Sequence, residues 1–264
     1  MVEKSQPRRA PNVYARNFTI STDALCFLVQ ISNHISNNPH IKIVHSLDEL
    51  ISTPFKGTIN ALCWQRQLQG NFREIVEQLK LTEGRMSLDE ALLDSLKLSE
   101  AGYSAKTQVL ADKLALEELG FQPNLECLYS YTCDLTSGPI ATDVYSFHVD
   151  KAAIETDTYL CTYSGLSSEI LQNDEATRKV DIPEIREQLL QAYGGKDGAR
   201  FKTHLSKRCY DLHYAAHPQA NILSMGVGNL WRIAVEYPQS PVAPCIHRAP
   251  ALQKGTSARL LLIC

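Results

Sequence analysis

The 264-residue chain carries 26 Lys and Arg against 29 Asp and Glu, a formal net charge of −3, and 44% of its residues are hydrophobic. This balance is ordinary for a globular protein with a sizeable core, and it argues against a dedicated nucleic-acid binder or a binder of anionic membranes. The longest apolar runs, 24–31 and 260–264, are too short to span a bilayer, and residues 1–17 lack the apolar core of a secretory signal. We therefore expect a cytoplasmic protein with neither a membrane nor a nucleic acid as partner.

Residues 1–16 contain Pro and Arg and predict a flexible tail, followed by a single domain over 17–264. Helical spacing of apolar residues dominates its first part, 17–120. The predicted elements of this part are a helix over 24–36, a strand over 41–45, a helical turn over 46–51, a buried strand over 58–65, helices that begin at 72 and 86, and a helix over 104–119. We expect these helices to pack on one outer face of the residues that follow.

The second part, 121–264, consists of short β-favouring segments separated by turn residues, a pattern typical of a β-sandwich or barrel. The predicted strands cover 126–133, 144–150, 158–163, 222–225, 230–236, 244–247 and 258–264. A helical insertion is expected around 170–219, where Pro183 begins a helix that runs to Tyr193 and ends at Gly194. The chain as a whole is therefore expected to have an α+β fold.

Eight cysteines form no C-x-x-C pair, and most lie inside apolar runs such as 61–64. Buried free thiols are common where the compartment is reducing. Cys127 and Cys133 are the only close pair, and their spacing is a weak zinc signal. We expect most of these thiols to be core side chains.

Two short stretches carry the chemistry: Phe147-His148-Val149-Asp150 and Ile246-His247-Arg248-Ala249-Pro250. Residues two apart in a β-strand project from one face, so His148 and Asp150 can reach a common point. His247 from a neighbouring strand would complete two imidazoles and one carboxylate, a set typical of non-haem iron sites with open coordination positions. The alternative is that His148 and His247 are hydrogen-bonded core histidines.

Arg259 is the single charged residue within the final apolar strand, 258–264. A cation in a core strand is costly unless it meets an anion. It either pairs with a buried acid, extends its head group to solvent, or binds the carboxylate of a cosubstrate beside the metal, for which guanidinium geometry is suited.

The order of H-x-D, a turn and strand over 226–231, a distal His and an Arg on the last strand resembles the iron(II)/2-oxoglutarate oxygenase superfamily, which has a double-stranded β-helix (jelly-roll, cupin-like) core. More closely, the chain resembles a bacterial family known as domain-of-unknown-function 1826. The matching segments are Leu62-Cys63-Trp64-Gln65-Arg66, Phe147-His148-Val149-Asp150, Leu160-Cys161-Thr162-Tyr163-Ser164-Gly165, His247-Arg248-Ala249-Pro250 and Arg259-Leu260-Leu261-Leu262. They span most of 58–264.

The superfamily resemblance implies an iron(II)- and 2-oxoglutarate-dependent dioxygenase with His148, Asp150 and His247 as metal ligands and Arg259 on the cosubstrate carboxylate. Tyr163 would bind the same carboxylate, or Thr162 if the strand is shifted by one residue. Arg248, typical of the smaller family, either belongs to the site or forms a structural salt bridge. The turn over 165–169 reads Gly-Leu-Ser-Ser-Glu where Gly-Pro-Gly-Thr-Glu is expected, which leaves any role of its backbone open.

Two other functions remain open: a non-oxidative zinc-binding protein of metal homeostasis, and an interaction module without metal. His213 and His217 have the spacing of two helical metal ligands, but Pro218 follows, so a loop or helix end is the expected location. The sequence contains no serine-hydrolase, phosphate-loop or dinucleotide-binding motif. The substrate, whether a small molecule or a protein, is not specified by these residues.

Overall fold

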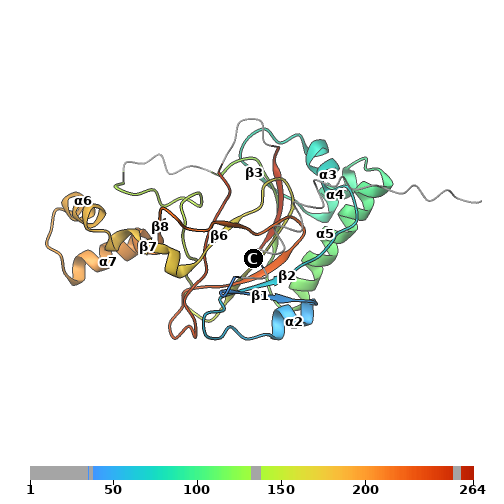
Figure 1. Cartoon of the computed structure of the whole chain (residues 1–264). Coiled ribbons are helices and arrows are strands. Elements are labelled where there is room, and N and C mark those ends of the chain that lie inside the picture. The colour runs from blue at the N-terminus through green and yellow to red at the C-terminus, as the bar shows by residue number, and fades with distance from the viewer. Residues whose placement is uncertain (1–34, 36–37, 132–137, 252–256) are drawn as a thin grey trace, which may run out of the picture.

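The computed structural model describes residues 35, 38–131, 138–251 and 257–264, which form a mixed α+β fold around a large sheet (Figure 1). The expected tail and, apart from Ile35, the helix expected over 24–36 lie outside these residues. Within the described part of the chain, no helix is both long and apolar enough to cross a membrane.

The large sheet has seven strands in the order β1-β2-β10-β5-β12-β4-β3, and every neighbouring pair is antiparallel except β1 and β2. The bounds are β1 Ile41–Val44, β2 Ala61–Trp64, β3 Arg85–Ser87, β4 Asn124–Leu128, β5 Asp157–Ser164, β10 Leu230–Ala234 and β12 Arg259–Ile263. Six of these fall on predicted strands. The prediction that a helix begins at Met86 was wrong. Residues 85–87 instead form β3, which pairs with β4, and the helix begins after Asp89, which caps it.

Helices α2 Leu47–Ser52, α3 Phe72–Leu79, α4 Glu90–Ser95 and α5 Glu100–Glu118 lie together beside this sheet (Figure 1). The buried cluster between them contains Ile75 of α3 and Val109 of α5 together with Tyr159 and Tyr163 of β5. The helices therefore cover one face of the large sheet, as the apolar spacing predicted.

A second sheet, of order β11-β6-β9, contains Ile246–Arg248, Glu169–Leu171 and Leu223–Ser224. The opposite face of the large sheet packs against it in a separate cluster that includes Leu160, Trp231, Ile170 and Leu223. Because side chains alternate along a strand, Thr158, Leu160 and Thr162 of β5 face the space between the sheets, and Tyr159, Cys161 and Tyr163 face the helices.

The predicted strand over 144–150 is reduced to backbone bridges at His148, which pairs with His247 on one side and His213 on the other. The predicted insertion contains the expected helix, α6 Pro183–Tyr193, ended by Gly194 in the left-handed conformation, and a second helix, α7 Ala199–Lys207. It is only partly helical, since β6, β7 (Ala176–Arg178) and β8 (Tyr214–Ala216) also fall in it. Short 3-10 helices cover Asn173–Glu175, Lys179–Asp181 and Tyr210–Leu212. Figure 1 shows α6 and α7 projecting on the side away from α2–α5.

Candidate metal centre

His148 and His247 come from distant parts of the sequence and lie directly opposite each other. Each backbone N–H donates to the other residue's carbonyl at 2.9 Å, as in a hydrogen-bonded pair of an antiparallel ladder. Side chains of such a pair project from the same face, and the two ring centroids are 4.6 Å apart. The backbone pairing therefore fixes how close the imidazoles lie.

Each imidazole is oriented by the backbone carbonyl of the residue two positions before it. Nδ1 of His148 lies 2.8 Å from the carbonyl oxygen of Ser146, and Nδ1 of His247 lies 3.2 Å from that of Cys245. A carbonyl only accepts, so both contacts require a proton on Nδ1 and leave the lone pair on Nε2. This tautomer presents Nε2 to a metal ion and is the arrangement usual for metal-ligating histidines.

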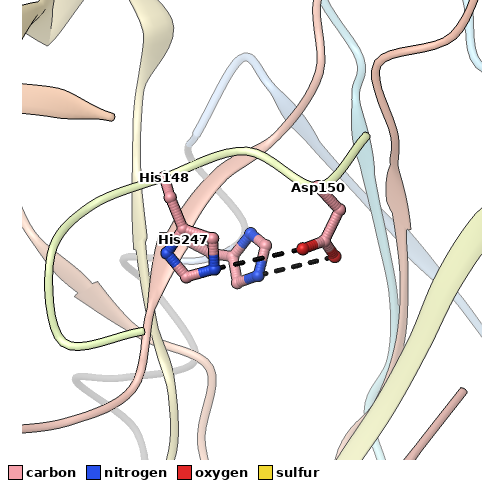
Figure 2. Close-up of side chains that lie close together, drawn as sticks. All are labelled: His148, Asp150 and His247. Atoms are coloured by element: carbon pink, nitrogen blue, oxygen red, sulfur yellow. Dashed lines mark ion pairs between the residues drawn. The ribbon is translucent and has the colours of Figure 1, made fainter. Parts of the chain in front are cut away.

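Asp150 completes the group from the same segment as His148 (Figure 2). Its carboxylate oxygens lie 3.9 Å from Nε2 of His148 and 3.7 Å from Nε2 of His247. One ligand atom from each of the three residues lies within 4.8 Å of the other two, a spacing that can hold a metal ion. Thr158 of β5 donates to Oδ2 of Asp150 at 2.6 Å and so holds the carboxylate from the large sheet.

The protonation states of His148 and Asp150 suit the binding of a cation. Burial, and then the nearby His247, lower the pKa of His148 to about 4, so its ring is neutral near pH 7. Burial alone would raise the pKa of Asp150, but His247, the Thr158 hydroxyl and His148 outweigh it, and the pKa is lowered. A neutral imidazole and an ionised carboxylate are the forms that bind a metal.

A third imidazole, His213, was not expected at this site. It bridges to the other side of His148, its ring centroid is 5.7 Å from that of His148, and it is buried. His217, its predicted helical partner, instead contacts Thr177 at 3.0 Å, and the two histidines flank β8, outside any helix. The relation of His213 to His148 depends on tertiary pairing, for which the spacing of residues gives no signal.

Arg259, at the start of β12, is buried in the same interior. Its Nη2 donates to Ser168 Oγ at 3.1 Å and to Thr162 Oγ1 at 3.4 Å, while Nε has no hydrogen-bond partner. No carboxylate of the described residues forms an ion pair with it. Two of the three explanations for a cation in this strand are therefore not met: Arg259 pairs with no buried acid of the described residues, and its side chain is buried away from solvent.

Thr162, rather than Tyr163, is directed toward Arg259. Tyr163 lies on the helix-facing side of β5, where its hydroxyl donates to Asp112 Oδ2 at 2.7 Å and its ring stacks on Phe72. The expectation that Tyr163 lies beside Arg259 is therefore wrong, and the alternative, Thr162, occupies that position; binding of a cosubstrate there stays a prediction.

Arg248 points away from the metal ligands. Its Nε donates to Glu169 Oε2 at 2.6 Å, and its guanidinium lies 4.1 Å from the centre of the Phe147 ring. Adjacent residues of a strand face opposite sides, so His247 and Arg248 cannot both point into the interior. The structural salt bridge is the alternative that the geometry shows.

Two cavities adjoin this interior. One of about 430 Å³ is lined by His148, Asp150 and His213, and further by Asp143, Ser206 and Cys209. The other, of about 1120 Å³, is lined by Tyr163, Gly165 and Ser167, but by none of the three candidate ligands and not by Arg259. Gly165 lies beside Arg259, since a Cβ built on it would be 3.0 Å from Cγ of Arg259.

No thiol of the described residues belongs to this group of ligands. Among the described cysteines, Cys63, Cys127, Cys161 and Cys245 are buried and free, and only Cys209 is exposed. Burial raises the pKa of Cys127 to about 11, which keeps the thiol protonated and unsuited to a metal. Cys133, the other half of the close pair, lies outside the described residues.

Comparisons with known protein families, with curated proteins and with solved structures find no match to this chain.

Proposed function

We propose that this protein is an iron(II)- and 2-oxoglutarate-dependent oxygenase, an oxidoreductase whose substrate is unidentified. The observation that carries the proposal is the convergence of His148, Asp150 and His247, with Nε2 of both rings turned toward the carboxylate. Two imidazoles and one carboxylate on one side of a metal leave positions for a chelating cosubstrate and oxygen. The resemblance to domain-of-unknown-function 1826 extends the same proposal to that family.

The arrangement of strands supports a jelly-roll core. In chain order, β4 and β5 belong to the large sheet, and the segment at His148 lies between them and joins the second sheet. Farther along, β10 and β12 return to the large sheet, with β11 of the second sheet between them. In the proposed core, β10, β5, β12 and β4 form one layer, the His148 segment, β11, β6 and β9 form the other, and β1–β3 extend the edges of the first.

The chain's own residues would have distinct roles in such a site. His148, Asp150 and His247 would bind the iron, which supplies the redox chemistry when bound. Ser146 and Cys245 hold the two imidazoles in the ligating tautomer through their carbonyls, and Thr158 orients the carboxylate. Such supporting contacts usually change metal affinity substantially.

The carboxylate of 2-oxoglutarate that is remote from the metal would bind at Arg259. The guanidinium is buried, lacks a carboxylate partner in the described chain and has an unsatisfied Nε. Hydroxyl groups of Thr162 and Ser168 already contact its Nη2 and could share the same anion. An isolated buried cation is costly, so a bound carboxylate would remove an existing electrostatic penalty.

The test is succinate formation by the iron-loaded protein with 2-oxoglutarate and oxygen, together with 2-oxoglutarate binding measured anaerobically. Uncoupled succinate formation does not require the substrate to be known. We expect wild type to bind 2-oxoglutarate and Arg259→Met to lose that binding while retaining iron. Iron binding with no 2-oxoglutarate binding in wild type would exclude this mechanism.

A second candidate, a non-oxidative zinc-binding protein, is favoured by the same three ligands, since three protein ligands and a water suit tetrahedral zinc. Competition between zinc and iron for the purified protein separates the two. Zinc that iron cannot displace, with no succinate formation after iron loading, would favour this second function. An absence of binding by either metal would favour an interaction module.

A further inference from the structure

The surface of α7 and its flanking residues is strongly basic. Residues 196–208 contain five Lys or Arg and one acidic residue, Asp197. The five cations are exposed, and we call them the α7 basic face: Lys196, Arg200, Lys202, Lys207 and Arg208. The concentration of positive charge contrasts with the net charge of −3 for the whole chain.

No acid among the described residues forms an ion pair with this face. The Asp197 carboxylate is already held by Arg186 of α6, through two hydrogen bonds of 2.8 Å each. None of the ion pairs between described residues involves a member of the α7 basic face. Its positive charge is therefore available to a partner.

Helix stability does not account for these residues. Each of α2–α6 has at least one acidic residue in its first turn, where the helix dipole favours negative charge. In α7 the first turn has none, Arg200 occupies it, and Gly198 provides no side-chain cap. Lys207 suits the C-terminal end of the dipole, but Arg200 near the N-terminal end opposes it.

The C-terminal end of α7 borders the cavity beside the candidate metal ligands. Ser206 and Cys209 line the cavity of about 430 Å³ that His148 and Asp150 also line. Lys207 and Arg208 lie between these two residues in the chain and are exposed. A ligand held at the C-terminal end of α7 would therefore lie near this cavity.

We propose that the α7 basic face captures an acidic polypeptide, one residue of which enters the cavity lined by His148 and Asp150. This inference rests on the proposed function for the identity of that cavity as the reaction site. The cavity volume of about 430 Å³ lies within the range of about 300–1,000 Å³ for ligand pockets, which is large enough to admit a side chain. The substrate class is therefore an acidic protein segment.

Nucleic acid fits this surface less well. Binding of single strands uses aromatic side chains as stacking platforms, and the aromatic rings of the α6–α7 pair are occupied. Tyr193 contacts Phe201 and His204, and Tyr210 lies against His204.

The experiment uses the full-length protein and a fluorescein-labelled Glu-Ala repeat peptide, with binding measured by anisotropy at low salt. The test variant is Arg200→Gln/Lys202→Gln/Lys207→Gln. The matched control, Lys42→Gln/Lys80→Gln/Lys97→Gln, removes the same charge from exposed positions away from α7. We expect the test variant to weaken binding roughly tenfold and the control less than about twofold, with the difference falling as salt rises.

The experiments distinguish a failure of the α7 surface proposal from a failure of the proposed metal-dependent function. If His148→Ala abolishes metal binding but peptide affinity is retained, the surface proposal holds whatever the chemistry of the site. No peptide binding by wild type, equal weakening by both triple variants, or tighter binding of a single-stranded oligonucleotide with the same dependence on α7 would overturn it.

Discussion

The Thr158 hydroxyl donates a hydrogen bond of 2.6 Å to Oδ2 of Asp150. This contact joins β5 of the large sheet to the segment that carries two of the three candidate ligands. It fixes one carboxylate oxygen and leaves the other, Oδ1, toward His148, whose Nε2 is 3.9 Å away. The orientation of the only anionic ligand therefore depends on a neutral residue eight positions along the chain.

Removing this hydroxyl tests whether it supports metal binding. Thr158→Val keeps the shape of the side chain but leaves Asp150 without its donor, and we expect metal affinity to fall roughly 10–100-fold, as for other outer-shell contacts. A chelator-competition titration gives the affinity. Thr107→Val, which removes a hydroxyl bonded to its own helix, is the matched control and should leave metal affinity unchanged. Equal affinities for wild type and Thr158→Val would contradict the role of Thr158.

The buried pair of Arg66 and Asp112 is expected to be structural. Two hydrogen bonds of 2.8 Å join them, and Asp112 also accepts from Tyr163 and Gln108, which ties α5 to the sheet. Arg66→Met would leave a buried carboxylate without its cation, so the free energy of unfolding should fall by about 3–5 kcal/mol. Urea denaturation measures this, and a loss below about 1 kcal/mol would show that the pair is not needed for stability.

Arg259→Met should behave differently, although Arg259 is equally buried. This cation has no carboxylate partner in the described residues, and burial lowers its pKa, which is the sign of an electrostatic penalty. We expect the free energy of unfolding without ligand to fall by at most about 1 kcal/mol, or to rise. Stabilisation by 2-oxoglutarate in a thermal shift assay should disappear. A loss as large as that of Arg66→Met would instead indicate a structural partner for Arg259.

The stability of the metal-free protein should depend on pH through His148. Its pKa is about 4 in the folded chain against an ordinary value of 6.5, so below pH 6.5 the unfolded chain binds a proton that the folded chain does not. The stabilisation is therefore complete above pH 6.5 and is lost as pH falls toward 4, by up to about 3 kcal/mol. Urea denaturation across this range should show a shallower dependence for His148→Asn; identical profiles would contradict the assignment.

Much of the site could be predicted because strand geometry is regular. His148 and Asp150 are two residues apart and share a face, and the expected strand of His247 does lie beside them. The same rule places Arg248 on the opposite face from His247, where it pairs with Glu169. The position of Arg248 next to His247 in the strand therefore favours a structural salt bridge over a role in the metal site.

Other features could not be read from residue spacing. β5 is buried on both faces from Thr158 to Tyr163, so no alternation of polar and apolar residues indicates which side Thr162 occupies. The three-residue strands β6, β7 and β8 are too short for a periodic signal, and the segment around them was expected to be helical. The place of His213 beside His148 likewise depends on pairing between distant segments.

The most direct test is elemental analysis of the protein after anaerobic loading with iron(II) and removal of free metal, for wild type and His148→Ala/His247→Ala. The account predicts about one iron per chain in wild type and almost none in the variant, with both folded by circular dichroism. Equal metal content in the two proteins, or none in wild type, would contradict a metal site at these residues.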